Sequence, residues 1–247
     1  MVAKPSQMPY KMSDKHFSIL STRPLDEALI AQAAHHNIAI DQETFIEIKK
    51  SINDTTFEQL KQLQSKNVTV VFTSMNAVEV LIESLSDKSK IPDWKIYCMG
   101  GATFSLIKKY WSYDSILGTA KNASELAKKI IEDNQTEVVF FCGNKRREEL
   151  PVLLHLQSVV VNELIIYETI ETAVRIDKDY CAILFFSPSA VHSFFEKNKV
   201  KDNTIFFAIG ETSAAAIKQF CNNKIIVSDF PSKDQMVEQA IKMMEEL

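Results

Sequence analysis

The chain has 247 residues, 46% of them hydrophobic, and a formal net charge of −4. That length suffices for one large or two small domains, and the negative charge argues against broad electrostatic binding of nucleic acid. The longest apolar runs, such as 138–142 and 181–186, are far shorter than the roughly 20 residues of a membrane-spanning helix. We therefore expect a globular protein with neither a nucleic-acid nor a membrane partner.

The first elements come after a polar leader. Residues 1–16 lack the apolar stretch of a secretory signal, so we expect a frayed leader on a cytoplasmic protein. A strand is predicted at 17–22 and a helix at 26–35, which starts close after Pro24. Polar and apolar residues then alternate over 38–50, which predicts one long strand.

Short apolar runs alternate with helical patterns along the rest of the chain, as in parallel α/β sheets. A second series has predicted strands at 68–73, 95–99, 115–119 and 137–142, and helices at 76–85, 103–110, 124–133 and 146–156. Another long strand pattern covers 159–169. A third series has predicted strands at 181–186, 205–209 and 224–228, and helices at 190–197, 213–221 and 233–246.

The second and third series repeat each other. FTSMNAV (72–78) and FFSPSAV (185–191) share four identities when Ser74 is laid on Ser187, which stands 113 residues later. The next matching turn, from Gly100 to Gly210, is offset by 110 residues. This long and nearly constant period predicts two domains of one fold, each near 110 residues.

The two long strand patterns, 38–50 and 159–169, flank the second series. We therefore predict two similar doubly wound parallel-sheet domains of flavodoxin-like α/β class, one inserted into the other through a two-stranded linker. The outer domain would comprise 1–40 and 170–247, and the inserted domain 41–169 with both linker strands. A paired linker would permit hinge motion.

Ligands of doubly wound sheets bind beyond the carboxyl ends of the strands, where the repeated corners lie. Hydroxyl and amide side chains there can cap the following helix, whose N–H groups can bind an anion. Capping preference alone would also explain these residue types, so both interpretations stay open. The candidate binding residues are Thr73, Ser74, Asn76, Gly100, Thr103, Ser187, Ser189, Gly210, Thr212 and Ser213, with Thr212 or Ser213 expected as a cap.

Basic residues stand near two strand ends. Arg23 follows the first strand, and the run KRR at 145–147, which includes Arg147, is expected in the first turn of a helix. The helix macrodipole disfavours cations in a first turn, which points to an anionic ligand. A solvated turn paired with the glutamates that follow is an equal alternative.

Familiar catalytic motifs are missing from the sequence. It has no H-E-x-x-H, G-x-S-x-G, Walker A or G-x-G-x-x-G pattern, so an enzyme of this sequence would act mainly by positioning its substrate. The four cysteines form no C-x-x-C pair and lie in or beside apolar runs, which favours buried free thiols over a metal or redox role.

Taken in order, these motifs resemble the uroporphyrinogen-III synthase family over essentially the whole chain from residue 17 on. The resemblance rests on STRP, FTSMNAV, GGATFSLI, GNKRREEL, LIIYET, FFSPSAV and AIGETSAAAI. It implies a monomeric lyase whose substrate is a small molecule, the linear tetrapyrrole hydroxymethylbilane, which bears eight carboxylates. The product is a macrocycle with its last ring inverted, formed with loss of water and without a metal or organic cofactor.

The resemblance also assigns roles to single residues. Tyr167 matches the family's tyrosine in the returning strand, proposed to assist loss of the hydroxyl, and Arg147 is the matched basic residue of GNKRREEL. The sequence departs from the family pattern at Met75, where many members have proline, at Asn76, where they often have arginine, and at Ser213, where threonine is common. A non-catalytic two-lobed anion-binding or sensor protein of the same architecture is the alternative.

Overall fold

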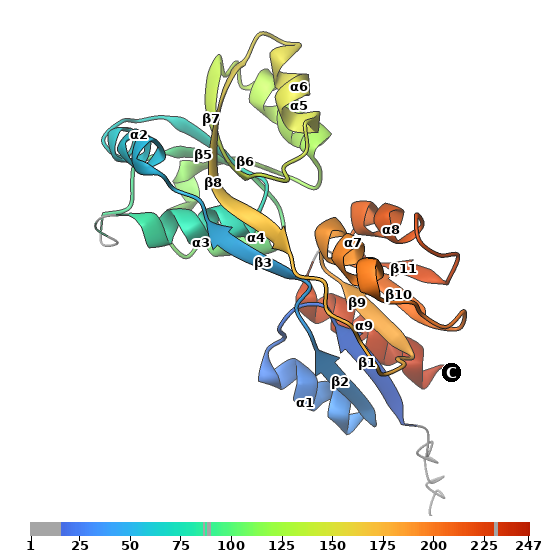
Figure 1. Cartoon of the computed structure of the whole chain (residues 1–247). Helices are drawn as coiled ribbons and strands as arrows, with labels where there is room; N and C mark the ends of the chain where they lie inside the picture. The colour runs from blue at the N-terminus through green and yellow to red at the C-terminus, as the bar shows by residue number, and fades with distance from the viewer. Residues whose placement is uncertain (1–15, 86, 88–89, 230–231) are drawn as a thin grey trace, which may run out of the picture.

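Two lobes, each built on its own β-sheet, make up the described part of the chain (Figure 1). A computed structural model describes residues 16–85, 87, 90–229 and 232–247. The predicted leader, apart from His16, lies outside these residues. No helix within the described ranges combines the length and the apolar character that crossing a bilayer requires.

The five-stranded lobe has its strands in the order β11-β10-β9-β1-β2, all parallel. Numbered along the chain this is the 2-1-3-4-5 order of flavodoxin-like sheets. Helices α1 and α9 pack on one face, and α7 and α8 on the other. The elements are β1 (Phe17–Ser21), α1 (Glu27–His35), β2 (Ile38–Gln42), β9 (Ala182–Phe185), α7 (Pro188–Lys197), β10 (Ile205–Ala208), α8 (Glu211–Ile217), β11 (Ile225–Val227) and α9 (Lys233–Glu245).

The six-stranded lobe has the order β3-β8-β7-β4-β5-β6, with β3 antiparallel to β8 and the other pairs parallel. Helices α2, α3 and α4 pack on one face, and α5 and α6 on the other. The elements are β3 (Ile46–Lys50), α2 (Asp54–Gln64), β4 (Thr69–Phe72), α3 (Met75–Ser84), β5 (Lys95–Met99), α4 (Ala102–Ile107), a 3-10 turn (Tyr113–Ser115), β6 (Ile116–Ala120), α5 (Ala123–Glu132), β7 (Glu137–Gly143), α6 (Glu149–His155) and β8 (Val160–Glu171).

The two sheets share one spatial order once the sequence repeat is used to align them. Laying β4 on β9 makes β6-β5-β4-β7-β8 correspond to β11-β10-β9-β1-β2. In the six-stranded lobe the chain runs through this common order starting at β4. In the five-stranded lobe it starts at β1, which corresponds to β7. The lobes are therefore circular permutations of each other, which explains why the repeat is visible only from β4 and β9 onward.

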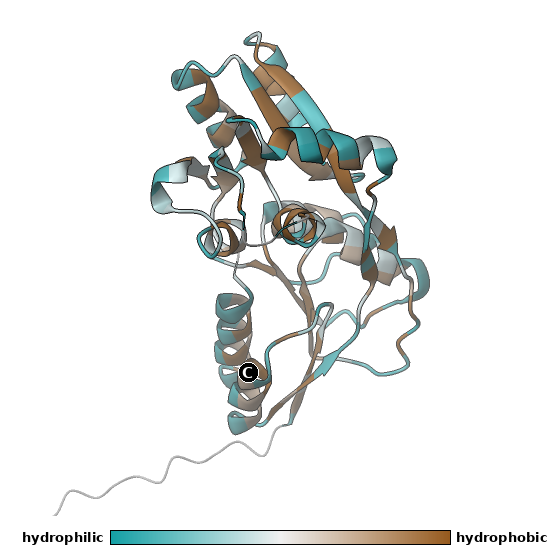
Figure 2. Ribbon diagram, turned by 90° about the vertical axis from the view of Figure 1, so that its left-hand side faces the viewer, coloured by the Kyte–Doolittle hydropathy of each residue, from teal (hydrophilic) through white to brown (hydrophobic). Residues whose placement is uncertain are grey.

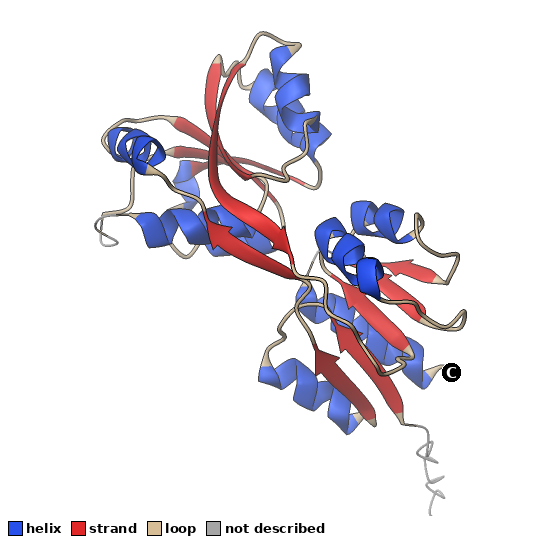
Figure 3. Cartoon of the chain, viewed as in Figure 1, coloured by secondary structure: helices blue, strands red, loops and turns tan. Residues whose placement is uncertain are grey.

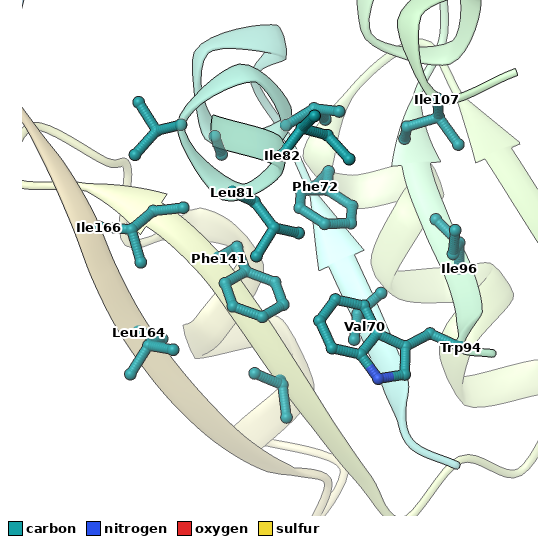
Figure 4. Packing of buried hydrophobic residues seen from close by; sticks show 14 of the residues in the cluster. Val70, Phe72, Leu81, Ile82, Trp94, Ile96, Ile107, Phe141, Leu164 and Ile166 are labelled. Carbon is teal, nitrogen blue, oxygen red and sulfur yellow. The ribbon is translucent and has the colours of Figure 1, made fainter. Parts of the chain in front are cut away.

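Both lobes bury their central strands on both faces. Val70, Val71 and Phe72 of β4 have no exposed surface, and β9 is buried along its whole length. Helices that cover both faces of a parallel sheet make such continuous apolar strands necessary. Figure 2 shows the resulting contrast between hydrophobic strands and helices that are hydrophilic on part of their surface. In the six-stranded lobe, Phe72 and Phe141 stack with their ring centroids 5.3 Å apart (Figure 4).

The predicted single strand over 38–50 is wrong. Its first part is β2 in one sheet and its last part is β3 in the other, with a crossover at 43–45. The alternation continues through the break because Phe45, in the crossover, is fully buried. Its ring packs edge-on against Phe194, with the ring centroids 5.2 Å apart. The period of two thus reflects burial in two different cores.

The second predicted linker strand, 159–169, corresponds to β8, and β3 pairs with its end. Ile46 lies opposite Glu171, and Lys50 lies opposite Tyr167. Figure 3 shows this antiparallel pair leading from one lobe toward the other. The architecture of two α/β lobes joined by two strands is confirmed, whereas the domain boundaries 1–40 with 170–247, and 41–169, stay a prediction.

Helix α2 was not predicted. Asn53 caps it by accepting a hydrogen bond from the Thr56 N–H at 2.9 Å, and Leu60 on its inner face is 1% exposed. Asparagine before a run with apolar residues three apart, at 57, 60 and 63, is a usable start signal. The helix was therefore detectable from the sequence.

Candidate active site

A cavity of about 880 Å³ is lined by residues of both lobes. Its walls are loops and helix starts that follow the carboxyl ends of strands in each sheet, which is where doubly wound sheets bind ligands. Predicted residues that line it are Arg23, Thr73, Ser74, Asn76, Gly100, Thr103, Ser187 and Gly210. We call this cavity the interlobe cleft.

A second cavity, of about 760 Å³, lies toward the amino ends of β4 and β7. Its lining is rich in amide side chains from α2, β8 and the turn before β7. None of the predicted site residues lines it. The interlobe cleft is therefore the better candidate, although the two cavities are similar in size.

Two corners of the cleft are built alike. The Ser74 Oγ accepts a hydrogen bond from the Asn76 N–H at 3.2 Å and caps α3. The Ser187 Oγ accepts one from the Ala190 N–H at 3.1 Å and caps α7. Each serine satisfies one N–H of the first turn and leaves the others available. Of the candidates offered at these corners, Ser74 and Ser187 are the caps, at equivalent positions of the two lobes.

The other two corners lack a side-chain cap. Helix α4 follows Gly101, whose φ of 68° lies in the left-handed region that favours glycine, and α8 follows Gly210 in extended backbone. Neither glycine offers a side-chain oxygen. The prediction that Thr212 or Ser213 caps α8 is therefore wrong, because the helix begins at Glu211.

Three candidates near these corners, Ser189, Thr212 and Ser213, do not line the cleft. Ser213 is 1% exposed, and its hydroxyl has no hydrogen-bond partner among the described residues. Ser189 and Thr212 lie in the first turns of α7 and α8 and do not line the cleft. Thr103 lines it from inside α4, although it is 6% exposed.

Arg23 is held at the end of β1 by a fixed loop. The Thr22 N–H and hydroxyl both donate to the Leu184 carbonyl, at 3.1 and 2.8 Å. The Ser21 hydroxyl donates to the Arg23 carbonyl at 2.6 Å. From this loop the Arg23 guanidinium reaches Met75 of the opposite lobe, with Nη2 3.7 Å from Sδ.

The KRR run does not occupy the first turn of a helix, because α6 begins only at Glu149. Lys145 pairs with Glu171, and Arg146 pairs with Glu163 of β8 and with Glu148. Arg147 is exposed and does not line the cleft. Ion pairs with the neighbouring strand therefore explain this basic run better than an anionic ligand does.

Tyr167 lies behind the Ser74 corner. The side chain is 7% exposed, does not line the cleft, and is hydrogen-bonded to Ser74. Burial raises the pKa of Tyr167 above its usual value, while the bond to Ser74 opposes that rise. The phenol therefore stays protonated at neutral pH. Ser74 is the member of this pair that faces the cleft.

Three charged lining residues were not predicted: Lys121, Glu211 and Asp229. Lys121 follows β6, Glu211 opens α8, and Asp229 stands just beyond β11. The rule that selected Arg23, a charge just after a predicted strand, applies equally to Lys121. That residue could therefore have been found from the sequence.

The cysteines differ in exposure. Cys98 and Cys142 are buried, as predicted, whereas Cys181 is exposed and Cys221 is partly exposed. All four are free thiols. Within the described ranges, no three His, Cys, Asp or Glu side chains come together as a metal site.

Known proteins share both the sequence pattern and the fold. A family model described as uroporphyrinogen-III synthase HemD matches residues 29–238. The uroporphyrinogen-III synthase of Saccharomyces cerevisiae is 30% identical over 118 residues, which span 41% of this chain and 42% of the yeast protein.

Two solved structures share the fold at low sequence identity. A mutant uroporphyrinogen III synthase from Thermus thermophilus superposes with a TM-score of 0.61 at 13% identity, covering 94% of this chain and 100% of that one. The Helicobacter pylori uroporphyrinogen-III synthetase superposes with a TM-score of 0.60 at 16% identity, covering 92% of this chain and 99% of that one. With the family model matched over most of its length, the chain belongs to the uroporphyrinogen-III synthase family.

Proposed function

We propose that this protein converts hydroxymethylbilane to uroporphyrinogen III, with loss of water and inversion of the last pyrrole ring. The observation that carries the proposal is the interlobe cleft, where equivalent serine-capped helix starts of the two lobes, at Ser74 and Ser187, line one cavity. Free N–H groups in a helix's first turn bind carboxylates. Two such starts can hold two regions of one poly-carboxylate.

The main task of the cleft is orientation. The bilane also closes unaided to the isomer without inversion, so the protein has to favour one transition state over another. We assign substrate binding to the predicted residues that line the cleft: Arg23, Thr73, Ser74, Asn76, Gly100, Thr103, Ser187 and Gly210. Ser189, Thr212, Ser213 and Arg147 are left out, because they do not line it.

Loss of the hydroxyl requires a proton for the departing oxygen, which leaves as water. Ser74 faces the cleft, and the buried phenol of Tyr167 is hydrogen-bonded to it. We assign Ser74 the contact with the leaving hydroxyl. Tyr167, which the family resemblance assigned to loss of the hydroxyl, lies behind Ser74 as a protonated phenol. Ser74 gives its proton to the departing oxygen and takes the proton of the phenol, which is restored by the proton that the last ring loses on closure.

The protein is further proposed to act as a monomer in the cytoplasm. A single chain supplies both walls of the cleft, so no second copy is needed to complete it. Four free cysteines, one of them exposed, suit a reducing compartment. Sedimentation equilibrium would test the first point, since a stable dimer at micromolar concentration contradicts it.

Isomer analysis tests the proposed activity. Freshly generated hydroxymethylbilane is incubated with and without the protein, and the products are oxidised and resolved as type I and type III porphyrins. We expect predominant type III with the protein present. A type I product unchanged from the protein-free control would refute the proposal.

A further inference from the structure

Charge is unevenly distributed over the interlobe cleft. The charged residues among its described lining are Arg23, Lys121, Glu211 and Asp229. Lys121 is the one that belongs to the six-stranded lobe, whereas the five-stranded lobe contributes Arg23 and both acids. Among the described lining residues, the six-stranded wall therefore contributes one cation and no acid, and the five-stranded wall contributes one cation and two acids.

Lys121 projects from a fixed backbone. The preceding residue, Ala120, accepts a hydrogen bond from the Gly100 N–H at 2.8 Å, and the Lys121 N–H donates to Glu125 at 3.3 Å. The next residue, Asn122, caps α5 through the Glu125 N–H at 2.8 Å. Yet the Lys121 ammonium forms no ion pair with any described residue. This cation is held at the cleft without a protein partner.

Arg23, on the other wall, also lacks an ion-pair partner among the described residues. Its guanidinium touches the Met75 thioether at 3.7 Å and forms no ion pair within the described ranges. A thioether is a weak acceptor, and a guanidinium has five N–H donors. Most of its hydrogen-bonding capacity is therefore available to a carboxylate, which it can bind in bidentate fashion.

The backbone positions near the two cations lie two strands apart in the sheet order. Arg23 reaches the start of α3, which follows β4, whereas Lys121 follows β6, two strands away in the order β4-β5-β6. Neighbouring strands lie about 4.8 Å apart, so these positions are separated by roughly 10 Å. A large molecule with carboxylates around its periphery can therefore pair with both cations at once.

We propose that Lys121 and Arg23 form a two-point carboxylate grip that makes the cleft selective for large poly-carboxylates. The grip rests on the proposed function, because it names how the same cleft recognises its tetrapyrrole substrate. Lys121 anchors one carboxylate on the six-stranded wall, and Arg23 binds another where the lobes approach. Glu211, an acid on the same wall as Arg23, repels carboxylates that are not paired with the grip.

Binding measurements with two porphyrinogens test the grip. Uroporphyrinogen I has eight carboxylates and coproporphyrinogen I has four; both are kept reduced under nitrogen and titrated calorimetrically at low and high salt. Lys121→Met and Arg23→Met should each weaken uroporphyrinogen binding about tenfold and coproporphyrinogen binding less, with a smaller salt dependence. Lys121→Arg should restore binding.

Two further variants complete the test: one should leave the affinity for uroporphyrinogen unchanged, and the other should increase it. Lys95→Met removes an exposed lysine at the amino end of β5, outside the cleft lining, and should bind like the wild type. Glu211→Gln should tighten uroporphyrinogen binding, because it removes a repulsive charge. Affinity of Lys121→Met equal to that of Lys95→Met, or equal losses for both ligands, would overturn the grip.

The outcomes separate the grip from the proposed function. A wild type that binds uroporphyrinogen I in a Lys121-dependent way, yet forms only type I product, would retain the grip and refute the synthase activity. If the wild type forms type III product and Lys121→Met binds uroporphyrinogen as tightly as the wild type does, the synthase activity is retained and the grip is refuted. Circular dichroism of each variant excludes loss of folding as the cause of a change.

Discussion

The aromatic ring of Tyr167 occupies the space that a side chain on Gly143 would need. A Cβ on Gly143 would lie 2.5 Å from the Tyr167 Cζ, and the two residues face each other across β7 and β8, next to a register shift. The bare backbone of Gly143 therefore lets the ring lie close against β7, with its phenol reaching Ser74 of the neighbouring corner. The position of one proposed catalytic corner depends on a glycine outside it.

Replacing Gly143 with alanine should disturb this corner. The new methyl group forces the Tyr167 ring away, and overpacking of this kind costs about 1–3 kcal/mol of folding free energy. We expect a lower urea midpoint and slower type III formation. Gly210→Ala is the steric control, since nothing lies within 4 Å of a Cβ there and the backbone is extended, and alanine at this N-cap should cost less than about 1 kcal/mol. Equal urea midpoints for the two variants would show that the Tyr167 ring moves aside without loss of folding free energy.

Tyr167→Phe isolates the phenol from the ring. The ring still packs against Gly143, so stability should fall by only about 1 kcal/mol, the value of one hydrogen bond. If Tyr167 orients Ser74 for proton donation, kcat should fall at least tenfold while the affinity for uroporphyrinogen stays the same. Single-turnover kinetics and calorimetry measure the two effects. A variant with full kcat would remove Tyr167 from the proposed mechanism.

Parts of this site follow from local sequence, and others do not. The serine caps were predictable because a cap depends on its own residue and the next few, as at Ser74 and Ser187. Lys121 was equally accessible to the same local rule. The start of α8 was misplaced because glycine, which has no side-chain oxygen, serves as the N-cap at Gly210.

Long-range relationships lay beyond the sequence pattern. The repeat at Ser74 and Ser187 indicated two similar folds, but only the strand order shows that one is a circular permutation of the other. The pairing of Arg146 with Glu163 depends on β7 and β8 lying side by side. The sequence therefore left this basic run open between an anion site and a solvated turn, because the Glu163 partner of Arg146 is 17 residues away.

The two serine caps form a matched pair for mutation. Ser74→Ala and Ser187→Ala should each cost about 1 kcal/mol of stability, because each removes one cap hydrogen bond in an equivalent helix. Only Ser74 is also the partner of Tyr167. We therefore expect Ser74→Ala to reduce kcat far more than Ser187→Ala does, at similar urea midpoints. Equal losses of kcat would mean that both serines act only through the helices they cap.

Thiol reactivity should distinguish the four cysteines. Burial raises the pKa of the Cys98 and Cys142 thiols to about 12, so at pH 8 only on the order of 10⁻⁴ of each is thiolate, the form that reacts with disulfide reagents. Cys181 is exposed and should react first, and Cys221, partly buried and with a raised pKa, should follow. Stopped-flow titration with a chromogenic disulfide measures these phases, and Cys181→Ser should abolish the fastest one. Cys98 and Cys142 should react at the rate of unfolding, which rises in urea. Rapid labelling of all four thiols in the native protein would contradict the burial of the β5 and β7 cores.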